Sequence, residues 1–141
     1  MFGPGTLDES HRRRSIYFMI KRSRLVPMMQ VFDQPEPLAS QGSRPSTTIA
    51  PQALLFMNNT QVVKWARSLA GTLDLKDPDT AIRQLYSRTL GRPPTPSELA
   101  GNRAFFDAQS VSYSDQTNAH QLALADLCQV MFSLNEFVYL P

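Results

Sequence analysis

Cysteine and histidine are scarce in this sequence, with one cysteine (Cys128) and two histidines (His11 and His120) among 141 residues. A single cysteine excludes an internal disulfide, a paired-cysteine metal site and a haem-attachment motif. Zinc would need further ligands at suitable local spacing, and no His-x-x-x-His pattern supplies them. We therefore predict no metal and no cofactor, and we expect Cys128 to be a small buried hydrophobic residue.

Long apolar runs and catalytic motifs are missing as well. The first thirty residues contain an apolar run of only five, Ile16 to Ile20, which is too short for the core of a signal peptide or for a membrane span. No glycine-rich phosphate loop, nucleophile elbow or dinucleotide fingerprint occurs. An enzymatic role would therefore require a larger site to which other residues contribute.

Charge is nearly balanced, with 14 basic and 12 acidic residues, yet six basic residues fall within thirteen positions that hold no acid. This basic patch consists of Arg12, Arg13, Arg14, Lys21, Arg22 and Arg24. Lysine and arginine neutralise phosphates, so the patch is one candidate for nucleic-acid binding. Because no recognised reading motif lies between its two halves, we favour a structural role, in which the patch pairs with acids of a partner domain.

The N-terminal third of the chain shows no long regular element. Residues 1–10 combine glycine, proline and scattered polar groups, which bury too little apolar surface to order a segment. The stretch 11–24 fits either a strand or a short helix, and we favour a helix. Four prolines between Val31 and Pro51 predict an extended connector. We expect Asp33 in this connector to bond an arginine of the basic patch.

The clearest apolar helical pattern runs from Thr47 or Thr48 to Ala70, and Gly71 follows where a left-handed C-terminal cap is expected. At about 100° per residue, Asn58 shares a face with the apolar side chains of this helix. We therefore predict that Asn58 faces a core or a boundary, whereas Asn59 leans away from it.

Three further helices are predicted downstream. One runs from Asp77 to Leu90, with an apolar stripe of Ala81, Ile82, Leu85, Tyr86 and Leu90 and with Gly91 just past its end. The next begins at Thr95, where Pro96 takes the first helical position and Glu98 completes a capping box, and it stops before residue 110. The last runs from about Asn118 to Leu134.

Together these patterns predict a mainly α fold with four or five helices and an extended proline-rich N-terminal arm. We place the arm and the basic patch in residues 1–50 and the helical domain in residues 51–141. The length of the chain suits one domain with a core of its own.

Five motifs in this order resemble a known family: "RRSIYFMIKRS", "VFDQPEP", "TTIAPQALLFMNN", "LYSRTLGRPPTPSEL" and "LADLCQVMFSLNEFVYLP". From about Arg13 to Pro141 the chain is similar to the C-terminal part of a planctomycete-type domain of unknown function, the DUF1553 type. Proteins of this type often also carry a planctomycete cytochrome c domain. The resemblance implies that the chain is a C-terminal piece of a longer, usually exported protein. It supplies no activity.

Our first hypothesis is a non-catalytic helical module whose apolar run, Ile16 to Ile20, packs against an upstream domain of the same longer protein. In the second hypothesis, this domain shapes the pocket of an exported enzyme or electron-transfer protein. The polar residues that would contribute are Asp33, Thr48, Gln52, Asn58 and Asn59. The same side chains could instead hold the connector onto the next helix by hydrogen bonds. Weak nucleic-acid binding through the basic patch is the third hypothesis.

Overall fold

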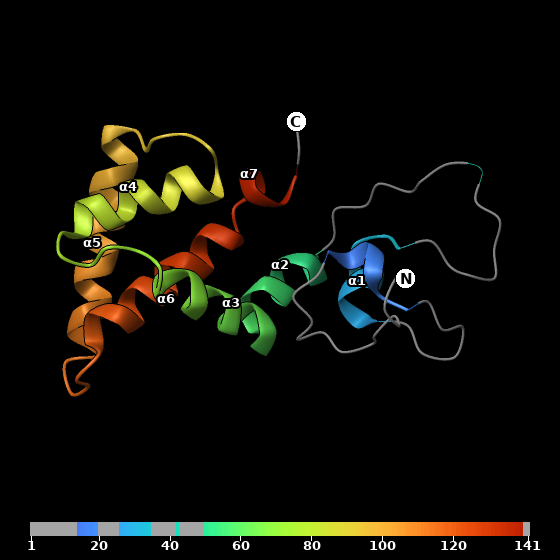
Figure 1. The fold of residues 1–141 in the computed structure, drawn as a ribbon, viewed down its shortest axis with the longest axis horizontal. Coiled ribbons are helices and arrows are strands. Elements are labelled where there is room, and N and C mark those ends of the chain that lie inside the picture. The colour runs from blue at the N-terminus through green and yellow to red at the C-terminus, as the bar shows by residue number, and fades with distance from the viewer. Residues whose placement is uncertain (1–13, 20–25, 35–41, 43–49, 140–141) are drawn as a thin grey trace, which may run out of the picture. The chain divides into compact units, whose positions relative to one another are not determined.

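The computed structural model of the protein describes residues 14–19, 26–34, 42 and 50–139. Within them the chain forms a short 3-10 helix, seven α-helices and no β-strand (Figure 1). These elements are η1 (Ser15–Tyr17), α1 (Pro27–Val31), α2 (Ala50–Asn58), α3 (Thr60–Ala70), α4 (Pro78–Thr89), α5 (Pro96–Ser112), α6 (Ala119–Phe132) and α7 (Asn135–Val138). A mainly α fold is therefore confirmed for this part of the chain. Most of the predicted proline-rich arm lies outside it.

The chain divides into two compact units, residues 1–55 and residues 56–141. Helix α2 begins in the first unit and ends in the second. The division predicted from the sequence, at residue 50, stays a prediction.

Among the described residues of the smaller unit, the helices are short. The sequence favoured a helix over residues 11–24, but in the described part of that stretch only a single 3-10 turn forms, at Ser15–Tyr17. Aromatic and β-branched side chains favour a helix less than straight chains do, which explains why this run does not extend the turn. Helix α1 was not predicted, and Pro27 occupies its first position, where no N–H is needed.

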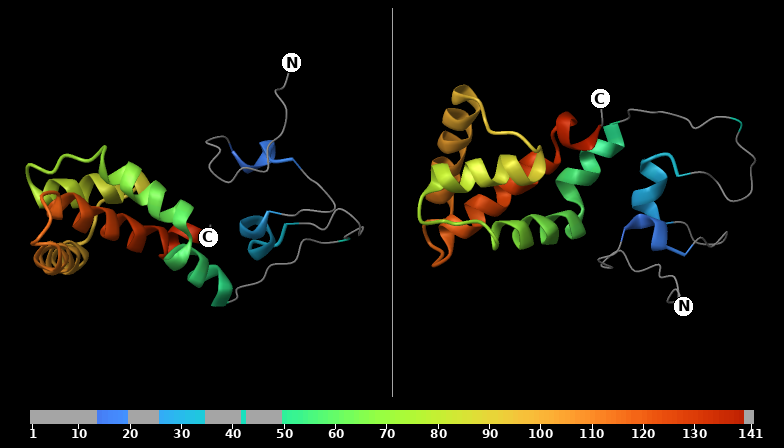
Figure 2. Two further views of the ribbon diagram at one scale, coloured as in Figure 1. Left: turned by 90° about the horizontal axis from the view of Figure 1, so that it is seen from below. Right: turned by 45° about the horizontal axis from the view of Figure 1, so that its top comes forward.

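Helix α6 is the centre of the larger unit. It packs against α3, α5, α4 and α7, and the two views of Figure 2 show α3 running alongside it. Its buried side chains lie on several sides of the helix and are Ala123, Leu124, Ala125, Leu127, Cys128 and Met131. A helix that is apolar on most of its surface must be covered by neighbours. The core of this unit therefore forms around α6.

Helix α4 begins and ends where local signals predict, and α5 begins where they predict. The Asp77 carboxylate accepts hydrogen bonds from the N–H groups of Asp79 and Thr80 at the start of α4. Ala81, Ile82, Leu85 and Tyr86 are buried on the predicted stripe. The predicted capping box is confirmed: Thr95 accepts from the Glu98 N–H, and Glu98 accepts from the Thr95 N–H at 2.7 Å.

The C-terminal part of the larger unit departs from the predicted boundaries. Helix α5 was expected to stop before residue 110 but continues to Ser112. The hydroxyl groups of Ser110 and Ser112 donate to the carbonyl oxygens four residues earlier, at 2.8 and 3.2 Å, and so fit within the helix. Helix α6 lies where predicted, whereas the single turn of α7 was not predicted.

The predicted helix from Thr47 or Thr48 to Ala70 is wrong in one respect, because it breaks at Asn59 into α2 and α3. Asn59 has extended backbone angles, and its Oδ1 accepts from the N–H groups of Gln61 and Val62 at 2.7 and 3.3 Å. The last carbonyls of α2 are bound from α6, where Gln129 Nε2 donates to Phe56 at 3.0 Å and Met57 at 2.8 Å.

The break also overturns the predicted orientation of Asn58, which is exposed. A helical phase counted through residue 59 assumes one continuous axis, and the extended cap ends that axis. Within α3, Trp65 is 38% exposed, while Val62 is fully buried.

Two glycines end helices in different ways. Gly91 follows α4 with φ of 70°, the left-handed conformation that suits a residue just past a helix end. Gly71 was predicted to adopt the same conformation, but its φ is −65° and its backbone is still right-handed. Its N–H donates to the carbonyl of Arg67 at 3.0 Å, so α3 closes with an ordinary helical turn.

We expect Asn59→Ala to lower the free energy of unfolding of residues 56–141 by about 1 kcal/mol, because two N–H groups at the start of α3 lose their acceptor. Asn58→Ala is the matched control, since this neighbouring residue is exposed, and it should change stability by less than about 0.5 kcal/mol. Urea unfolding of both variants measures the difference. Equal losses would contradict the assignment of Asn59 as the cap.

A second matched pair tests the two glycines. Gly91→Ala should destabilise the larger unit by about 1 kcal/mol, because a left-handed backbone crowds a Cβ against the following carbonyl. Gly71→Ala should be neutral or stabilise by about 0.5 kcal/mol, since its Cβ would meet only carbonyl oxygens at 3.5 and 3.6 Å. Thermal unfolding of the two variants separates these outcomes, and a loss at both positions would refute the conformations described.

Candidate functional site between helices α4 and α5

Two of the polar residues predicted to line a site lie at or contact the end of α1. Asp33 follows this helix with φ of 56°, and the next N–H, of Gln34, donates to the Met29 carbonyl at 3.0 Å. This is the hydrogen bond of a Schellman cap, with Asp33 at its left-handed position. Gln52 is buried, and its Nε2 donates to the Val31 carbonyl at 3.0 Å. Both residues therefore serve the backbone of α1.

The other predicted binding residues do not gather at a cavity. Asn59 caps α3 and Asn58 is exposed. Neither lines the hollows found in the larger unit. Thr48 lies outside the described residues. The expected bond between Asp33 and the basic patch stays a prediction, because Arg12, Arg13, Lys21, Arg22 and Arg24 also lie outside the described residues, and Arg14 is exposed.

An arginine that the sequence did not single out organises the turn between α4 and α5. Arg92 donates from Nη2 to Glu98 at 2.8 Å and from Nε to Glu136 at 2.7 Å. Its guanidinium also lies 5.4 Å from the centre of the Tyr86 ring. The Tyr86 hydroxyl in turn accepts from Asn102 Nδ2 at 2.8 Å. One side chain thus connects α4, α5 and α7.

The electrostatics of this cluster follow from its hydrogen bonds. The Arg92 guanidinium and the Thr95 N–H lower the pKa of Glu98 to about 2. Arg92 also lowers the pKa of Glu136. The two carboxylates together raise the pKa of Arg92 above its ordinary value. All three groups are therefore held in their charged forms at neutral pH.

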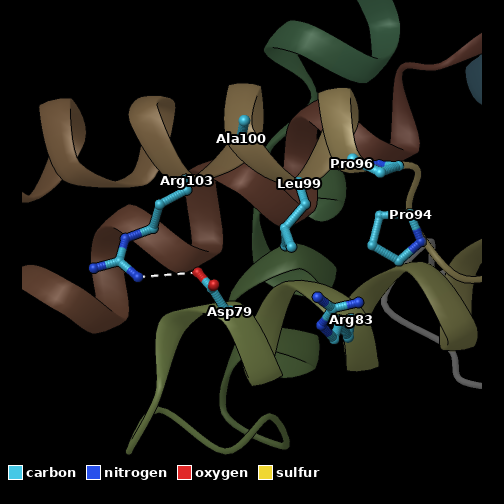
Figure 3. A pocket seen from close by; sticks show the side chains of 7 residues that line it. All are labelled: Asp79, Arg83, Pro94, Pro96, Leu99, Ala100 and Arg103. Atoms are coloured by element: carbon cyan, nitrogen blue, oxygen red, sulfur yellow. Dashed lines mark hydrogen bonds and ion pairs between the residues drawn. The ribbon is translucent and has the colours of Figure 1, made fainter.

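Beside this turn lies a hollow of about 340 Å³ between α4 and α5. Its lining combines apolar and charged side chains, which are Asp79, Arg83, Pro94, Pro96, Leu99, Ala100 and Arg103 (Figure 3). Arg103 donates from Nη1 to Asp79 at 3.0 Å and from Nε to both oxygens of Asp107 at 3.1 Å. These two carboxylates raise the pKa of Arg103. The hollow is thus bordered by one paired arginine and by Arg83.

The polar groups that line the hollow are charged and suited to ion pairing. Its titratable lining consists of two guanidinium groups and one carboxylate that already pairs with one of them. No serine, cysteine or histidine lines it. Arginine side chains next to apolar walls suit an anion with an apolar part.

The cysteine and the histidine of the larger unit occupy separate places. Cys128 is fully buried, as predicted, and burial raises the pKa of its thiol to about 12. A thiol held neutral is a poor nucleophile. The His120 ring lies 5.7 Å from the Phe106 ring. Among the described residues, no group of three or more His, Cys, Asp or Glu side chains could hold a metal ion.

The Arg92 cluster makes stability depend on pH. The pKa of Glu98 falls from 4.5 to about 2 on folding, so its stabilising effect is complete above about pH 4.5 and is lost as the pH falls toward 2. Arg92→Gln should therefore flatten the decline in urea midpoint between about pH 6 and pH 3. Arg88→Gln is the control, because Arg88 bonds Thr72 and no carboxylate. An unchanged decline in Arg92→Gln would contradict this origin.

Comparison with known proteins identifies the family but no function. Residues 5–106, more than half of the chain, match the model of a family described as "Protein of unknown function (DUF1553)". The match starts earlier than the predicted resemblance and does not include residues 107–141, for which the resemblance stays a prediction. No curated protein and no solved structure matches the chain. None of the helices in the described ranges is long and apolar enough to cross a membrane. The chain belongs to the DUF1553 family of proteins of unknown function.

Proposed function

We propose that this chain is a non-catalytic helical module that docks onto another folded domain through the apolar segment at residues 16–19. The observation that carries the proposal is exposure: Ile16 is 81% exposed, Tyr17 44% and Met19 37%. Adjacent large apolar side chains on a surface are typical of an interaction site.

The free energy gained by burying these apolar side chains favours docking over exposure to water. Full burial of one large apolar side chain is worth about 1.5 to 3 kcal/mol before the costs of association are subtracted. Three such side chains in four consecutive positions provide a continuous contact for a partner. Ile16 and Tyr17 lie in the backbone turn at Ser15–Tyr17, and Met19 follows it in the sequence.

The basic residues around the segment indicate which kind of surface a partner would present. Arg14 is exposed directly before it, and the sequence places further basic residues on both sides with no acid between positions 12 and 24. A partner that covers the segment would therefore present an apolar recess bordered by carboxylates. Pairing of opposite charges at the rim would set the orientation of the docked domain.

We place this partner upstream in the same, longer polypeptide, and a cytochrome c domain is one form that it could take. This part of the proposal rests on the resemblance of the five motifs to proteins that combine such domains. Contribution to the pocket of an enzyme or electron-transfer protein is the alternative. It has less support, because Asp33, Gln52 and Asn59 are positioned to serve nearby backbone groups. Nucleic-acid binding through the basic patch ranks third.

The 141-residue chain without its partner should self-associate through the exposed segment. Sedimentation equilibrium should show an average mass that rises above the monomer value of 15.9 kDa with concentration. A double variant, Ile16→Ser with Met19→Ser, should remain closer to the monomer. Val111→Ser is the matched control, because Val111 on α5 is also an exposed apolar residue, at 73%, and it should behave like the unmodified chain.

Hydrogen exchange supplies the decisive comparison. The amides of residues 16–19 should exchange more slowly in the longer polypeptide than in the 141-residue chain, because docking covers them. Equal exchange rates in the two proteins would refute docking onto an upstream domain. A chain that stays monomeric and already protects these amides would refute the proposal altogether.

A further inference from the structure

The hollow between α4 and α5 carries an inference that is independent of the docking segment. We propose that it binds a carboxylate attached to a small apolar group, with Arg83 as the main contact for the carboxylate. Three features of the hollow favour such a ligand: the hydrogen bonding of its two arginines, the fixed position of its apolar wall and the sign of the charge at its border.

The carboxylate at the spacing to pair with Arg83 already binds another arginine. Asp79 lies one helical turn earlier on α4, at the spacing from which a carboxylate ordinarily pairs with an arginine. Its Oδ1 instead accepts from Arg103 at 3.0 Å, and Arg83 has no polar partner among the described residues. A planar guanidinium with five N–H donors therefore remains available at the edge of the hollow.

Arg103 keeps part of its donor capacity as well. Its Nε and Nη1 groups bond Asp107 and Asp79, while its Nη2 donates to no group in the part of the chain that is described. In the view of Figure 3, Leu99 lies between Arg103 and Asp79 on one side and Arg83 with the two prolines on the other. An anion in the hollow would therefore have an arginine as hydrogen-bond donor on either side of Leu99.

The apolar wall is held in place before any ligand arrives. Pro94 is buried, and Pro96 begins α5 next to the Thr95–Glu98 capping box. The carboxylates of Glu98 and Glu136 hold the same loop through Arg92. A site with few rotatable parts loses little conformational entropy on binding. About 340 Å³ is enough for a small ring or a branched aliphatic group.

The charge at the border selects among anions. The Asp79 carboxylate lines the hollow and repels a second negative charge on the ligand. A monocarboxylate is therefore favoured over a phosphate, which carries close to two charges near neutral pH. The apolar side chains that line the hollow likewise favour a ligand with an apolar group over acetate.

A carboxylate next to an apolar group could belong to a free carboxylic acid or to an acidic side chain beside an apolar residue in a peptide.

Benzoate is the probe for this site, and amide chemical shifts of the intact 141-residue chain are the measurement. Benzoate should shift the signals of Leu99, Ala100 and Arg103 in a saturable way, whereas the neutral isostere benzamide should not. Phenyl phosphate should bind more weakly than benzoate. Arg83→Gln should weaken benzoate by roughly threefold to tenfold, the range for a charge-assisted contact at an exposed site.

Arg67→Gln is the matched control, because Arg67 is an exposed arginine on α3 that does not line the hollow. It removes the same charge and should leave benzoate binding unchanged. Overlapping spectra of the free variants would establish that both fold. Equal shifts with benzamide, or equal weakening by the two substitutions, would overturn the proposal.

A blocked dipeptide, acetyl-Phe-Glu-amide, separates the two sources of the carboxylate. Tighter binding of this peptide than of benzoate would assign the hollow to a peptide segment, and the reverse would assign it to a free acid. Absence of saturable shifts with both probes would refute the inference. None of these results depends on residues 16–19, so the docking proposal and this one can fail separately.

Discussion

The need to cover the buried side chains of α6 determines the rest of the larger unit. Six of its side chains are buried, so α3, α4 and α5 must surround it for the helix to be stable in water. The break between α2 and α3 follows the same constraint, because Gln129 of α6 holds the last carbonyls of α2. Asn59 then restarts the chain as α3 alongside α6.

A second constraint fixes the turn that joins α4 to α5. Gly91 permits the left-handed step, and the capping box starts α5 within a few residues. Arg92 then joins this turn to Glu136 on α7. These local and distant bonds act on the same six residues between α4 and α5. The hollow beside Leu99 lies next to this turn, and a wall held in place by such bonds favours the small ligand that we propose there.

Polar residues that stand out in the sequence are candidates both for binding and for supporting helix ends. Asn59, Gln52 and Asp33 each serve a helix end, and such ends require partners whether or not a protein binds anything. Arg83 and Arg103 were not singled out, since arginines spaced along amphipathic helices look like ordinary solvated residues in a sequence. In the tertiary structure, Asp79 pairs with Arg103, which is farther away in the sequence than Arg83.

The sequence by itself determined the helical class, the starts of α4 and α5, the capping box and the burial of Cys128. The helix starts and the capping box depend on neighbours within about one helical turn, where residue type and spacing fix the hydrogen bonds. The helical class and the burial of Cys128 follow from the apolar pattern along the helices. The tertiary structure alone decided the break at Asn59, the right-handed backbone at Gly71, the links made by Arg92 and the presence of a hollow. Those features depend on groups far apart in the chain, such as Gln129 with Met57 and Arg92 with Glu136. Local periodicity contains no information about which distant side chain will complete a bond, because that choice is made by packing around α6.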